Sequence, residues 1–471
     1  MRDQQLFLNG RWVPGVDTFE VRDPFDQSLV GTVAVASPEQ AAEAVSAARA
    51  AMLLDWPAAS RADVLLKTSQ LVAERSADFA EVLRAEAGKP ITAALVEVTR
   101  AVGTLRIASE EARRLPSETV QFDEVSPGVT PLGFTIPKPF GVVAAITPFN
   151  FPLNLVLHKV APALAAGCAV VLKPSERTPL SAGLLAETLA EAGLPAGWLN
   201  VVTGRPQEIV PIWNDHPDVA VITFTGSAEV GWKLKAASPR KRHVLELGSN
   251  TAMVVAADAD LKRAVNAVVA GGYTFSGQAC VSVQRVYVEE PVADEFTAML
   301  AAAVANLPVG DTKDPATVVG PVISEQSRER LVAWIDEAVQ GGARIATGGT
   351  MEGACLRPTV LANVPATARV VSEEVFGPVA SIRTVKSVTE GIDEVNSARY
   401  GLNTAIFTSD LASALQFARE AEAGSVLVNI TPAFRADHMP YGGVKDSGQG
   451  REGVKYAIAE LLDQRLVVLA P

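Results

Sequence analysis

From residue 138 onward the chain alternates short apolar runs with helical stretches, and this alternation limits the folds that it can adopt. Apolar runs of strand length occupy 141–146, 168–172, 199–202 and 219–224, and helical periodicity occupies 156–166, 180–193 and 206–213. Strand–helix–strand units of this kind build a parallel sheet that is buried on both faces. A second series follows, with strands expected at 252–256, 283–288, 376–384 and 425–430 and helices at 260–270, 291–306, 324–341 and 410–422. The pattern therefore predicts an α/β fold.

The chain on either side of this alternation has a different character. Residues 6–32 alternate apolar and polar positions, which predicts short strands. Ser37 is a predicted N-cap for a helix that runs to Ala51, and helical patterns continue over 60–87 and 91–114. Between 115 and 137 the strand-like runs are interrupted by Pro116, Pro127, Pro131 and Pro137, which is typical of a sheet edge or an excursion. The alternating segment 461–469 is a candidate partner for that excursion.

The overall composition excludes several classes of partner. The 471 residues are 48% hydrophobic and 20% charged, enough for large cores in more than one domain. A formal charge of -12 would repel nucleic acid and anionic membranes. The first residues do not resemble a signal peptide. Three widely spaced cysteines, Cys168, Cys280 and Cys355, fit a reducing compartment. We therefore expect a cytoplasmic protein without a metal site and without nucleic-acid or membrane partners.

Cys280 is the first candidate for chemistry. It follows a Ser276-Gly277 turn and precedes the alternating run 281–288. A free cysteine is most often a small buried hydrophobe. A reactive cysteine instead needs a partly exposed, electropositive environment that favours its thiolate. The position of Cys280 alone favours the structural role, so evidence for a chemical role must come from other parts of the chain.

Five motifs accompany Cys280. They are Ile146-Thr147-Pro148-Phe149-Asn150-Phe151-Pro152, Leu172-Lys173-Pro174-Ser175-Glu176, Phe224-Thr225-Gly226-Ser227, Leu245-Glu246-Leu247-Gly248 and Glu373-Glu374-Val375-Phe376-Gly377-Pro378. In order and spacing these motifs resemble the signatures of aldehyde dehydrogenases, and the resemblance extends from Leu8-Asn9-Gly10 to Tyr441-Gly442-Gly443. It implies an aldehyde dehydrogenase-like fold with a Rossmann-type cofactor domain, an α/β catalytic domain and a small oligomerisation strand excursion.

The resemblance implies catalytic roles that fit the chemistry of the residues. Cys280 would be the nucleophile, because thiolate attack converts an aldehyde into a thiohemiacetal that can release hydride. The Asn150 amide and the Cys280 backbone N–H would stabilise the oxyanion. Glu246 would be the general base that hydrolyses the thioester to a free acid, and Lys159 is implied as a further catalytic residue. Taken alone, Asn150 could be a turn residue and Glu246 a surface or ion-paired glutamate.

The resemblance also implies an NAD site, with NADP possible. Lys173 and Glu176 would bind the adenosine ribose, and the carboxylate would repel a 2′-phosphate, which favours NAD. Gly226, Ser227 and Gly231 would place helix N-terminal N–H groups against the pyrophosphate, although Ser227 could also be an ordinary helix cap. The remaining implied cofactor residues are Thr147, Pro148, Phe149, Ser175, Leu247, Glu374 and Phe376.

Two features depart from the expected cofactor motifs. Gly448, Gly450 and Gly453 form a Gly-x-Gly-x-x-Gly, but no strand leads into it and no βαβ unit surrounds it. We therefore interpret this segment as a flexible loop and not as a dinucleotide fingerprint. Ser249 stands where the family commonly has a second glycine, which leaves the conformation of that turn open.

The implied substrate pocket contains Phe151, His158, Ala279 and Arg435. His158 stands where members for apolar aldehydes carry Trp and succinate-semialdehyde members carry Arg, which indicates a polar substrate. Ala279 lacks the charge that phosphorylated-glyceraldehyde members place there. We expect a small hydroxyaldehyde such as lactaldehyde or glycolaldehyde. An anionic semialdehyde anchored by Arg435 is an alternative, although an exposed, solvated arginine is the usual state. A cysteine acyl hydrolase without a nicotinamide step is another.

The resemblance gives domain limits as well. It implies an NAD-binding domain from 1–114 and 138–248, a catalytic domain from 249–440 and an oligomerisation segment from 115–137 and 455–471. Because the last two stretches are similar to the dimerising strands of the family, we expect a homodimer or a homotetramer.

Overall fold

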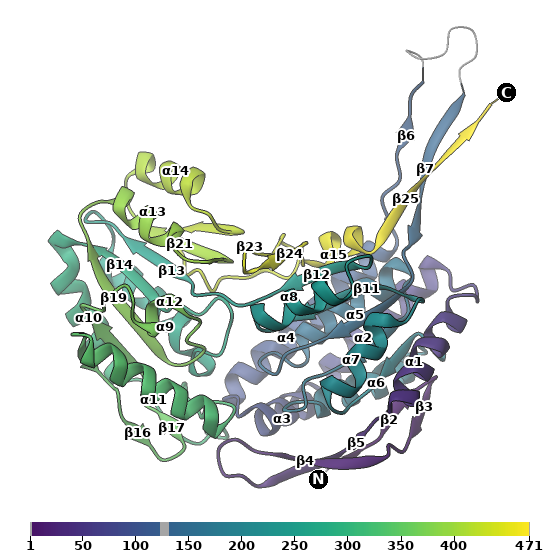
Figure 1. Cartoon of the computed structure of the whole chain (residues 1–471), viewed down its shortest axis with the longest axis horizontal. Coiled ribbons are helices and arrows are strands. Elements are labelled where there is room, and N and C mark those ends of the chain that lie inside the picture. The colour runs from purple at the N-terminus through teal and green to yellow at the C-terminus, as the bar shows by residue number, and fades with distance from the viewer. Residues whose placement is uncertain (1, 123–130, 471) are drawn as a thin grey trace.

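The computed structural model describes residues 2–122 and 131–470, most of which belong to two α/β bodies (Figure 1). The first body contains an eight-stranded sheet with the order β24-β12-β11-β8-β9-β10-β2-β3. Its strands are β2 (Leu6–Leu8), β3 (Arg11–Val13), β8 (Val142–Ile146), β9 (Val170–Lys173), β10 (Leu199–Val201), β11 (Val219–Thr225), β12 (Arg242–Glu246) and β24 (Gly448–Gln449). The apolar strands β8 to β11 are almost completely buried, as their sequences predict.

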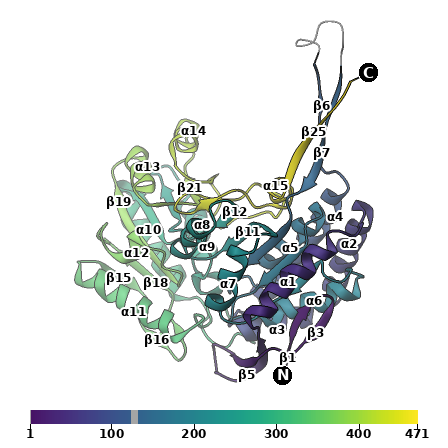
Figure 2. The ribbon, with the colours of Figure 1, turned by 45° about the vertical axis from the view of Figure 1, so that its right-hand side comes forward.

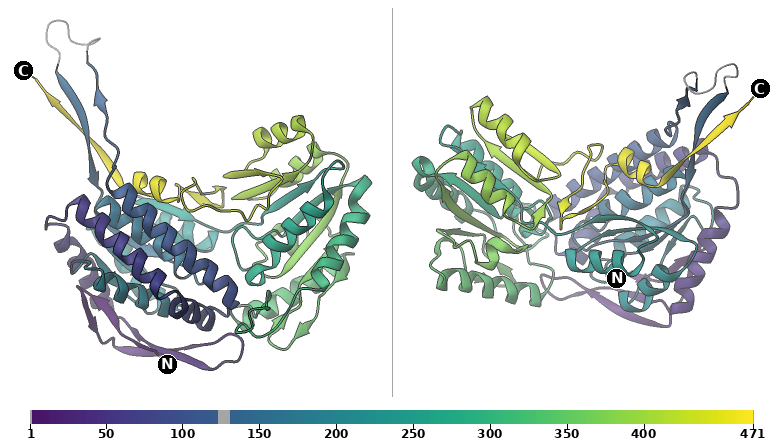
Figure 3. Two further views of the ribbon diagram at one scale, coloured as in Figure 1. Left: turned by 180° about the vertical axis from the view of Figure 1, so that it is seen from behind. Right: turned by 45° about the horizontal axis from the view of Figure 1, so that its top comes forward.

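Helices cover both faces of this sheet (Figure 3). They are α1 (Pro38–Ala51), α2 (Ala58–Glu74), α3 (Ser76–Ala87), α4 (Ile91–Ala112), α5 (Asn154–Ala166), α6 (Leu180–Glu191), α7 (Pro206–Asp215) and α8 (Ala228–Ala237). The predicted start of α1 is confirmed, because Ser37 and Gln40 form a reciprocal capping box. The helical pattern over 60–87 is two helices, α2 and α3, which break at Arg75.

The second body contains a seven-stranded sheet with the order β15-β18-β19-β14-β13-β21-β22. Its strands are β13 (Ala252–Val255), β14 (Arg285–Glu289), β15 (Arg344–Thr347), β18 (Thr359–Ala362), β19 (Val379–Val385), β21 (Asn403–Phe407) and β22 (Ser425–Val428). Its helices are α9 (Leu261–Tyr273), α10 (Ala293–Ala305), α11 (Glu325–Gln340), α12 (Arg369–Ser372), α13 (Val388–Asn396) and α14 (Leu411–Glu420). The sequence pattern did not predict β15, β18, β21 or α13.

A three-stranded sheet projects from the first body (Figures 1 and 2). It consists of β6 (Thr119–Val120), β7 (Leu132–Pro139) and β25 (Leu462–Leu469), in the order β25-β7-β6. β25 pairs antiparallel with β7 along its whole length, so the predicted partnership of the two segments is confirmed. Within residues 2–122 and 131–470, β6 pairs only with Gly133 and Phe134, so Pro137 lies on a stretch of β7 that has β25 as its one neighbour. Pro127 lies outside the described residues.

The C-terminal part of the chain connects the two bodies (Figure 1). β23 (Val444–Lys445) pairs with β20 (Tyr400–Gly401), then β24 pairs antiparallel with β12, and α15 (Val454–Glu460) packs against α5. The interpretation of the Gly448 segment as a flexible loop is therefore wrong. A Cβ at Gly448, whose φ is 144°, would collide with the Leu245 carbonyl, so the glycine permits a close strand pairing.

The remaining strands are short. β1 (Arg2–Gln4), β5 (Leu29–Val35) and β4 (Asp17–Arg22) form a three-stranded sheet, and β16 (Met351–Glu352) pairs with β17 (Cys355–Leu356). The strands predicted within 6–32 are therefore present as β2 to β5. Of the helices in residues 2–122 and 131–470, none combines the length and the apolar character that crossing a membrane requires.

Candidate active site

Four parallel strands of the first sheet end at one edge, and their last residues carry the implied motifs. Ile146 of β8 pairs with Lys173 of β9 and with Phe224 of β11, and Thr225 of β11 pairs with Glu246 of β12. The chain leaves β8 toward β9 on one side and later returns to β11 on the other. Such a switch in strand order opens a crevice at the carboxyl ends of the strands, where α/β sheets bind ligands. Motifs that are far apart in sequence meet because their strands are neighbours.

The turn from β11 into α8 fits the pyrophosphate of a dinucleotide. Gly226 N–H donates to the Glu246 carbonyl at 3.0 Å, and Ser227 caps α8 by accepting from Val230 N–H. A Cβ at Gly231 would collide with the Leu247 side chain, so the glycine lets α8 approach the strand closely. The first N–H groups of a helix carry partial positive charge and have no partner within the helix. This end of α8 can therefore hold a phosphate group.

The loop after β8 and the segment around Glu374 supply further groups. The buried hydroxyl of Thr147 has no hydrogen-bond partner among the described residues, which fits a donor reserved for a ligand. Glu374 accepts from Ser249 N–H at 3.0 Å, and burial raises the pKa of Glu374 to about 7. Phe376 has a φ of 49° and packs the edge of its ring against Phe149, with centroids 5.7 Å apart. Pro148 precedes Phe149 and is half-buried.

Ser249 fits its turn without a glycine. Its φ is not among the positive values of the chain, so the backbone there is open to any residue. Its hydroxyl lies 3.1 Å from the hydroxyl of Thr251, and its side chain is buried. The departure from the family pattern at this position therefore leaves the turn unstrained.

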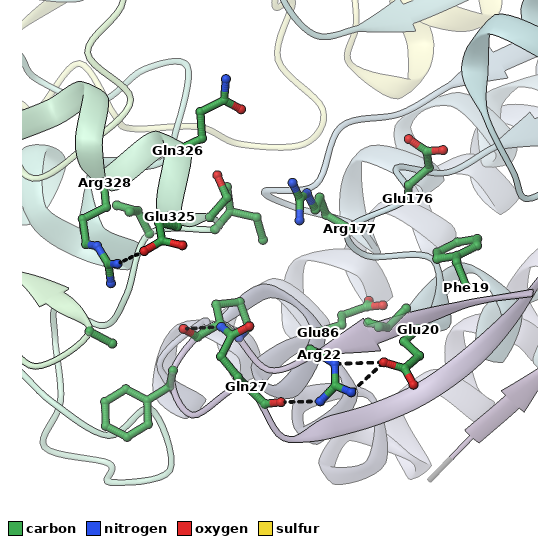
Figure 4. Close-up of a pocket in the computed structure, with 17 residues that line it drawn as sticks. Phe19, Glu20, Arg22, Gln27, Glu86, Glu176, Arg177, Glu325, Gln326 and Arg328 are labelled. Carbon is green, nitrogen blue, oxygen red and sulfur yellow. Dashed lines mark hydrogen bonds and ion pairs between the residues drawn. The ribbon is translucent and has the colours of Figure 1, made fainter.

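The predicted ribose-binding residues lie at the end of β9. Lys173 is buried, its Nζ donates to the Pro174 carbonyl at 3.3 Å, and burial lowers its pKa to about 8. The Ser175 hydroxyl accepts from the backbone N–H of Arg177. Glu176 is exposed and lines, with Arg177, a charged cavity of about 680 Å³ (Figure 4). Cys280 is not among the residues that line this cavity.

Cys280 follows a buried segment with a strained backbone. Phe275, Ser276 and Gly277 have φ values of 51°, 56° and 67°, three left-handed residues in succession. The Ser276 hydroxyl donates to the Gly320 carbonyl at 2.8 Å and holds the segment in place. Such conformations are costly for residues other than glycine and persist where the surrounding structure determines them. The turn before Cys280 is therefore a fixed feature and not a flexible one.

Asn150 lies against this segment. Its side-chain amide donates to the Gln278 carbonyl at 2.9 Å, and its own oxygen has no partner among the described residues. An amide nitrogen carries two hydrogens, so one remains for an oxyanion. No hydrogen bond donated by the Cys280 backbone N–H occurs in the described part of the chain. Each of the two donors that the resemblance implies thus has a hydrogen left for an oxyanion.

A buried ion pair that the sequence did not indicate supports Asn150. Lys89 is fully buried, is paired with the buried Glu97, and donates to the Asn150 carbonyl at 2.7 Å. Its ammonium also lies 4.1 Å from the ring centroid of Phe151 and 4.4 Å from that of Phe275. Glu97 could have been noticed, because it lies on the apolar face of α4. Lys89 lies between the predicted helical stretches 60–87 and 91–114, where the sequence pattern gives no sign of burial.

Two carboxylates share the space behind Cys280 and differ in their partners. Glu246 is 3% exposed, and both of its oxygens lack a hydrogen-bond partner among the described residues. Burial, followed by the nearby charge of Glu452, raises the pKa of Glu246 well above its usual value. Glu452 binds Lys159 at 3.0 Å and Arg435 at 2.9 Å. Burial alone would raise the pKa of Glu452, but these two cations outweigh it and hold that pKa at about 2.

Two of the remaining predicted pocket residues, His158 and Arg435, have buried side chains and form, with Asp437, a group that we call the polar wall. The interpretation of Arg435 as solvated is wrong, because its side chain is 8% exposed and its guanidinium lies 3.7 Å from the centroid of the Tyr441 ring. His158 is buried, with Nε2 at 2.9 Å from an Asp437 oxygen. Burial lowers the pKa of His158, and the Arg435 charge adds to this. Ala279 is half-buried beside Cys280.

The comparisons with known proteins agree with this geometry. The model of the aldehyde dehydrogenase family matches residues 12–467. The chain belongs to the aldehyde dehydrogenase family. It is 42% identical over 464 residues to a 3-sulfolactaldehyde dehydrogenase of Priestia aryabhattai, with 98% of this chain and 97% of that protein covered. It is 34% identical over 472 residues to a lactaldehyde dehydrogenase of Methanococcus aeolicus, with 98% and 99% covered.

Solved structures of other aldehyde dehydrogenases share the fold. An NADP-dependent glyceraldehyde-3-phosphate dehydrogenase from Bacillus halodurans C-125, complexed with NADP, has a TM-score of 0.97 at 35% identity and covers 100% of this chain and 99% of its own. An NAD-dependent aldehyde dehydrogenase from Sinorhizobium meliloti has a TM-score of 0.95 at 33% identity, with 99% and 95% covered. The predictions of family and fold are confirmed. The cofactor of this aldehyde dehydrogenase is a nicotinamide dinucleotide, since the similar solved structures include enzymes that use NAD and enzymes that use NADP.

Proposed function

We propose that this aldehyde dehydrogenase oxidises a small polar aldehyde of the lactaldehyde or glycolaldehyde kind to its carboxylic acid. The observation that carries the proposal is the polar wall, the group of buried polar side chains in which His158 contacts Asp437. Arg435 of this group lies over the ring of Tyr441, whose hydroxyl is 3.0 Å from Cys280 Sγ. His158 Nδ1 and Arg435 Nε are buried and have no hydrogen-bond partner among the described residues. Unpaired buried polar atoms are costly unless a ligand satisfies them, so this wall favours a hydroxylated substrate over an apolar one. Two similar proteins act on lactaldehyde or 3-sulfolactaldehyde according to their names.

A second candidate is an anionic derivative of such a hydroxyaldehyde. The buried guanidinium of Arg435 favours it, because Arg435 Nε remains unpaired after the terminal nitrogen has bound Glu452. Guanidinium groups bind carboxylates, phosphates and sulfonates with charge-assisted hydrogen bonds. Comparison of a neutral and an anionic hydroxyaldehyde of the same length separates the two candidates.

The residues account for each step of the reaction. The Cys280 thiolate attacks the carbonyl carbon, and the Asn150 amide and the Cys280 N–H stabilise the oxyanion that forms. A nicotinamide dinucleotide held by the β11–α8 turn, Lys173 and Glu176 would supply the acceptor for the hydride that leaves the thiohemiacetal carbon. The thioester that remains on Cys280 is attacked by water, which gives its proton to Glu246 while the C–S bond breaks and the acid is released. Glu452, Lys159 and Arg435 hold this site without taking the proton.

We also propose that NAD is preferred over NADP. The support is Glu176, an exposed carboxylate at the end of β9, where the adenosine ribose of the family lies. A carboxylate accepts hydrogen bonds from two ribose hydroxyls and repels a 2′-phosphate. Arg177 lines the same cavity and reduces this repulsion, so NADP remains usable at lower efficiency.

We further propose a cytoplasmic homodimer or homotetramer with the domain limits given above. The strand β25 supports the assembly, because Leu466, Val468 and Leu469 expose about half of their surfaces to solvent on a projecting sheet. Apolar side chains on such a strand are typical of a surface that another chain covers. The cysteines Cys168, Cys280 and Cys355 are free thiols, which fits a reducing compartment.

The test is an aldehyde panel with both cofactors. Lactaldehyde, glycolaldehyde, 3-sulfolactaldehyde, succinate semialdehyde and hexanal are incubated with the enzyme and NAD or NADP, and reduced cofactor is followed by absorbance. We expect the hydroxyaldehydes with NAD to have the highest kcat/KM. Cys280→Ser should abolish the signal and Cys168→Ser, a buried cysteine elsewhere, should not. A preference for hexanal, or ester cleavage without any nicotinamide-dependent step, would refute the proposal.

A further inference from the structure

The side chain of Tyr441 touches the reacting atom. Its hydroxyl lies 3.0 Å from Cys280 Sγ. In the described part of the chain, Tyr441 is the only residue with a hydrogen bond to that sulfur. Tyr441 is 2% exposed, and its backbone exchanges two hydrogen bonds with Glu452, so the position of the phenol is fixed by the chain on which it lies. The contact is therefore built into the fold.

The direction of this hydrogen bond follows from the chemistry of the two groups. A thiolate has no hydrogen and can only accept. The phenol keeps its proton, because burial and the neighbouring Cys280 raise the pKa of Tyr441 well above its usual value. When Cys280 is ionised, the Tyr441 O–H must be the donor. The Arg435 guanidinium above the ring strengthens the contact by holding the ring in place.

The charges around Cys280 make such a donor necessary. Burial raises the pKa of the Cys280 thiol to about 11. Glu374 and Glu246 act in the same direction, whereas the Tyr441 hydrogen bond and the Arg435 charge act against them. A nucleophilic cysteine needs a population of thiolate at neutral pH. Of the described residues, the Arg435 cation, which Glu452 already binds, and the Tyr441 phenol favour the thiolate most.

We propose that Tyr441 is a further catalytic residue, whose O–H stabilises the Cys280 thiolate before it attacks the aldehyde. The proposal rests on Cys280 as the nucleophile. The thiol proton leaves to solvent water, since Cys280 is partly exposed. The thiolate accepts from Tyr441, then forms the C–S bond while the carbonyl π bond breaks and its electrons move to oxygen. The phenol keeps its proton throughout and loses its acceptor as the sulfur becomes neutral.

Alkylation of the thiol tests this role without substrate or cofactor. The rate of Cys280 modification by iodoacetamide is measured against pH for the wild type, Tyr441→Phe and Tyr287→Phe, and Cys280→Ser supplies the background from Cys168 and Cys355. Tyr287 is a buried tyrosine whose hydroxyl accepts from Arg285, so its variant is a matched control. Because the measurement needs no aldehyde oxidation, its outcome is independent of the proposed substrate.

Tyr441→Phe should raise the apparent pKa of Cys280 by about one unit or more, the effect expected when a hydrogen bond to a charged group is lost. The alkylation rate below that pKa should fall about tenfold, and the plateau at high pH should not fall. Tyr287→Phe should match the wild type. An unchanged pH profile of the alkylation rate in Tyr441→Phe overturns the proposal. If the KM for the aldehyde is then raised in separate turnover assays, the Tyr441 hydroxyl contacts the substrate and not the thiolate.

A second substitution covers the case in which Tyr441→Phe does not fold. Replacement of Tyr441 by 3-fluorotyrosine keeps the shape of the ring and makes its O–H a stronger donor. We expect the apparent pKa of Cys280 to fall in this variant, opposite to the shift in Tyr441→Phe. A rise, or no shift, overturns the proposal.

Discussion

Replacement of Glu246 by glutamine tests the hydrolytic half of the reaction. The carboxyl is buried without a hydrogen-bond partner among the described residues, and an amide of the same size fits the same space, so the variant should fold. Glu452 cannot take over as the base, because Lys159 and Arg435 hold its pKa at about 2. Loss of a general base costs about 10²–10⁴ in rate, which is about 3–5 kcal/mol of activation free energy for thioester hydrolysis.

Rapid mixing separates the two halves of the reaction. We expect the Glu246→Gln variant to produce a burst of one reduced cofactor per active site, followed by turnover at least about a hundredfold slower than in the wild type. The exposed Glu290 supplies a control, since Glu290→Gln should behave as the wild type does. Steady turnover of Glu246→Gln within twofold of the wild type would refute the assignment. A first turnover that is as slow as the later ones would instead place Glu246 before hydride transfer.

The pH dependence of the wild type follows from the same residue. Burial and the charge of Glu452 raise the pKa of Glu246, so its carboxylate form increases only as the pH rises through that elevated value. Where hydrolysis limits turnover, kcat should therefore increase with pH, and in Glu246→Gln this increase should be absent. The same shift makes ionisation of Glu246 unfavourable in the folded state, so its contribution to stability decreases as the pH rises from its unfolded to its folded pKa.

Three further predictions concern the cofactor, the oxyanion loop and the assembly. Glu176→Gln should raise the ratio of kcat/KM for NADP to that for NAD by about two- to fivefold, the effect of one exposed charge, and an unchanged ratio would contradict the ribose assignment. Lys89→Met leaves Glu97 buried without its cation and should lower the free energy of unfolding in urea by about 3–5 kcal/mol. Replacement of the exposed Lys67 by methionine should leave that free energy almost unchanged, and equal losses in the two variants would contradict a structural role for the Lys89–Glu97 pair. Leu466→Asp should reduce the mass measured by light scattering, and an unaltered mass would exclude β25 as the interface.

The elements of the first body could be predicted well because each is specified locally. The strands β8 to β11 are apolar runs of strand length, and α1 carries its cap and its proline. The break between α2 and α3 at Arg75 could not be predicted, since no glycine or proline marks it. β21 was missed for a different reason. Its polar residues Asn403 and Thr404 are buried through hydrogen bonds to distant carbonyls, which local sequence does not show.

The site divides in the same way. The motifs at the ends of strands could be found because each is a short continuous run of residues that resembles a family signature. Contacts such as Tyr441 with Cys280, or Glu452 with Lys159, are made only when the C-terminal segment returns across both bodies. The burial of Arg435 therefore depends on tertiary pairing. The loop that contains Arg435 has no hydrophobic periodicity, so its sequence does not predict that the Arg435 side chain is buried.

The balance of charge behind Cys280 explains how two neighbouring carboxyl groups can have different roles. Two cations, Lys159 and Arg435, lie within reach, and both bind Glu452. Glu246 is left without one, so burial raises its pKa while that of Glu452 falls. When the surroundings shift the pKa values of two carboxyl groups in opposite directions, one group can exchange protons and the other stays ionised. Here Glu246 is the first and Glu452 is the second. The same pairing that removes Glu452 from catalysis therefore leaves Glu246 as the carboxyl group that can exchange a proton with water.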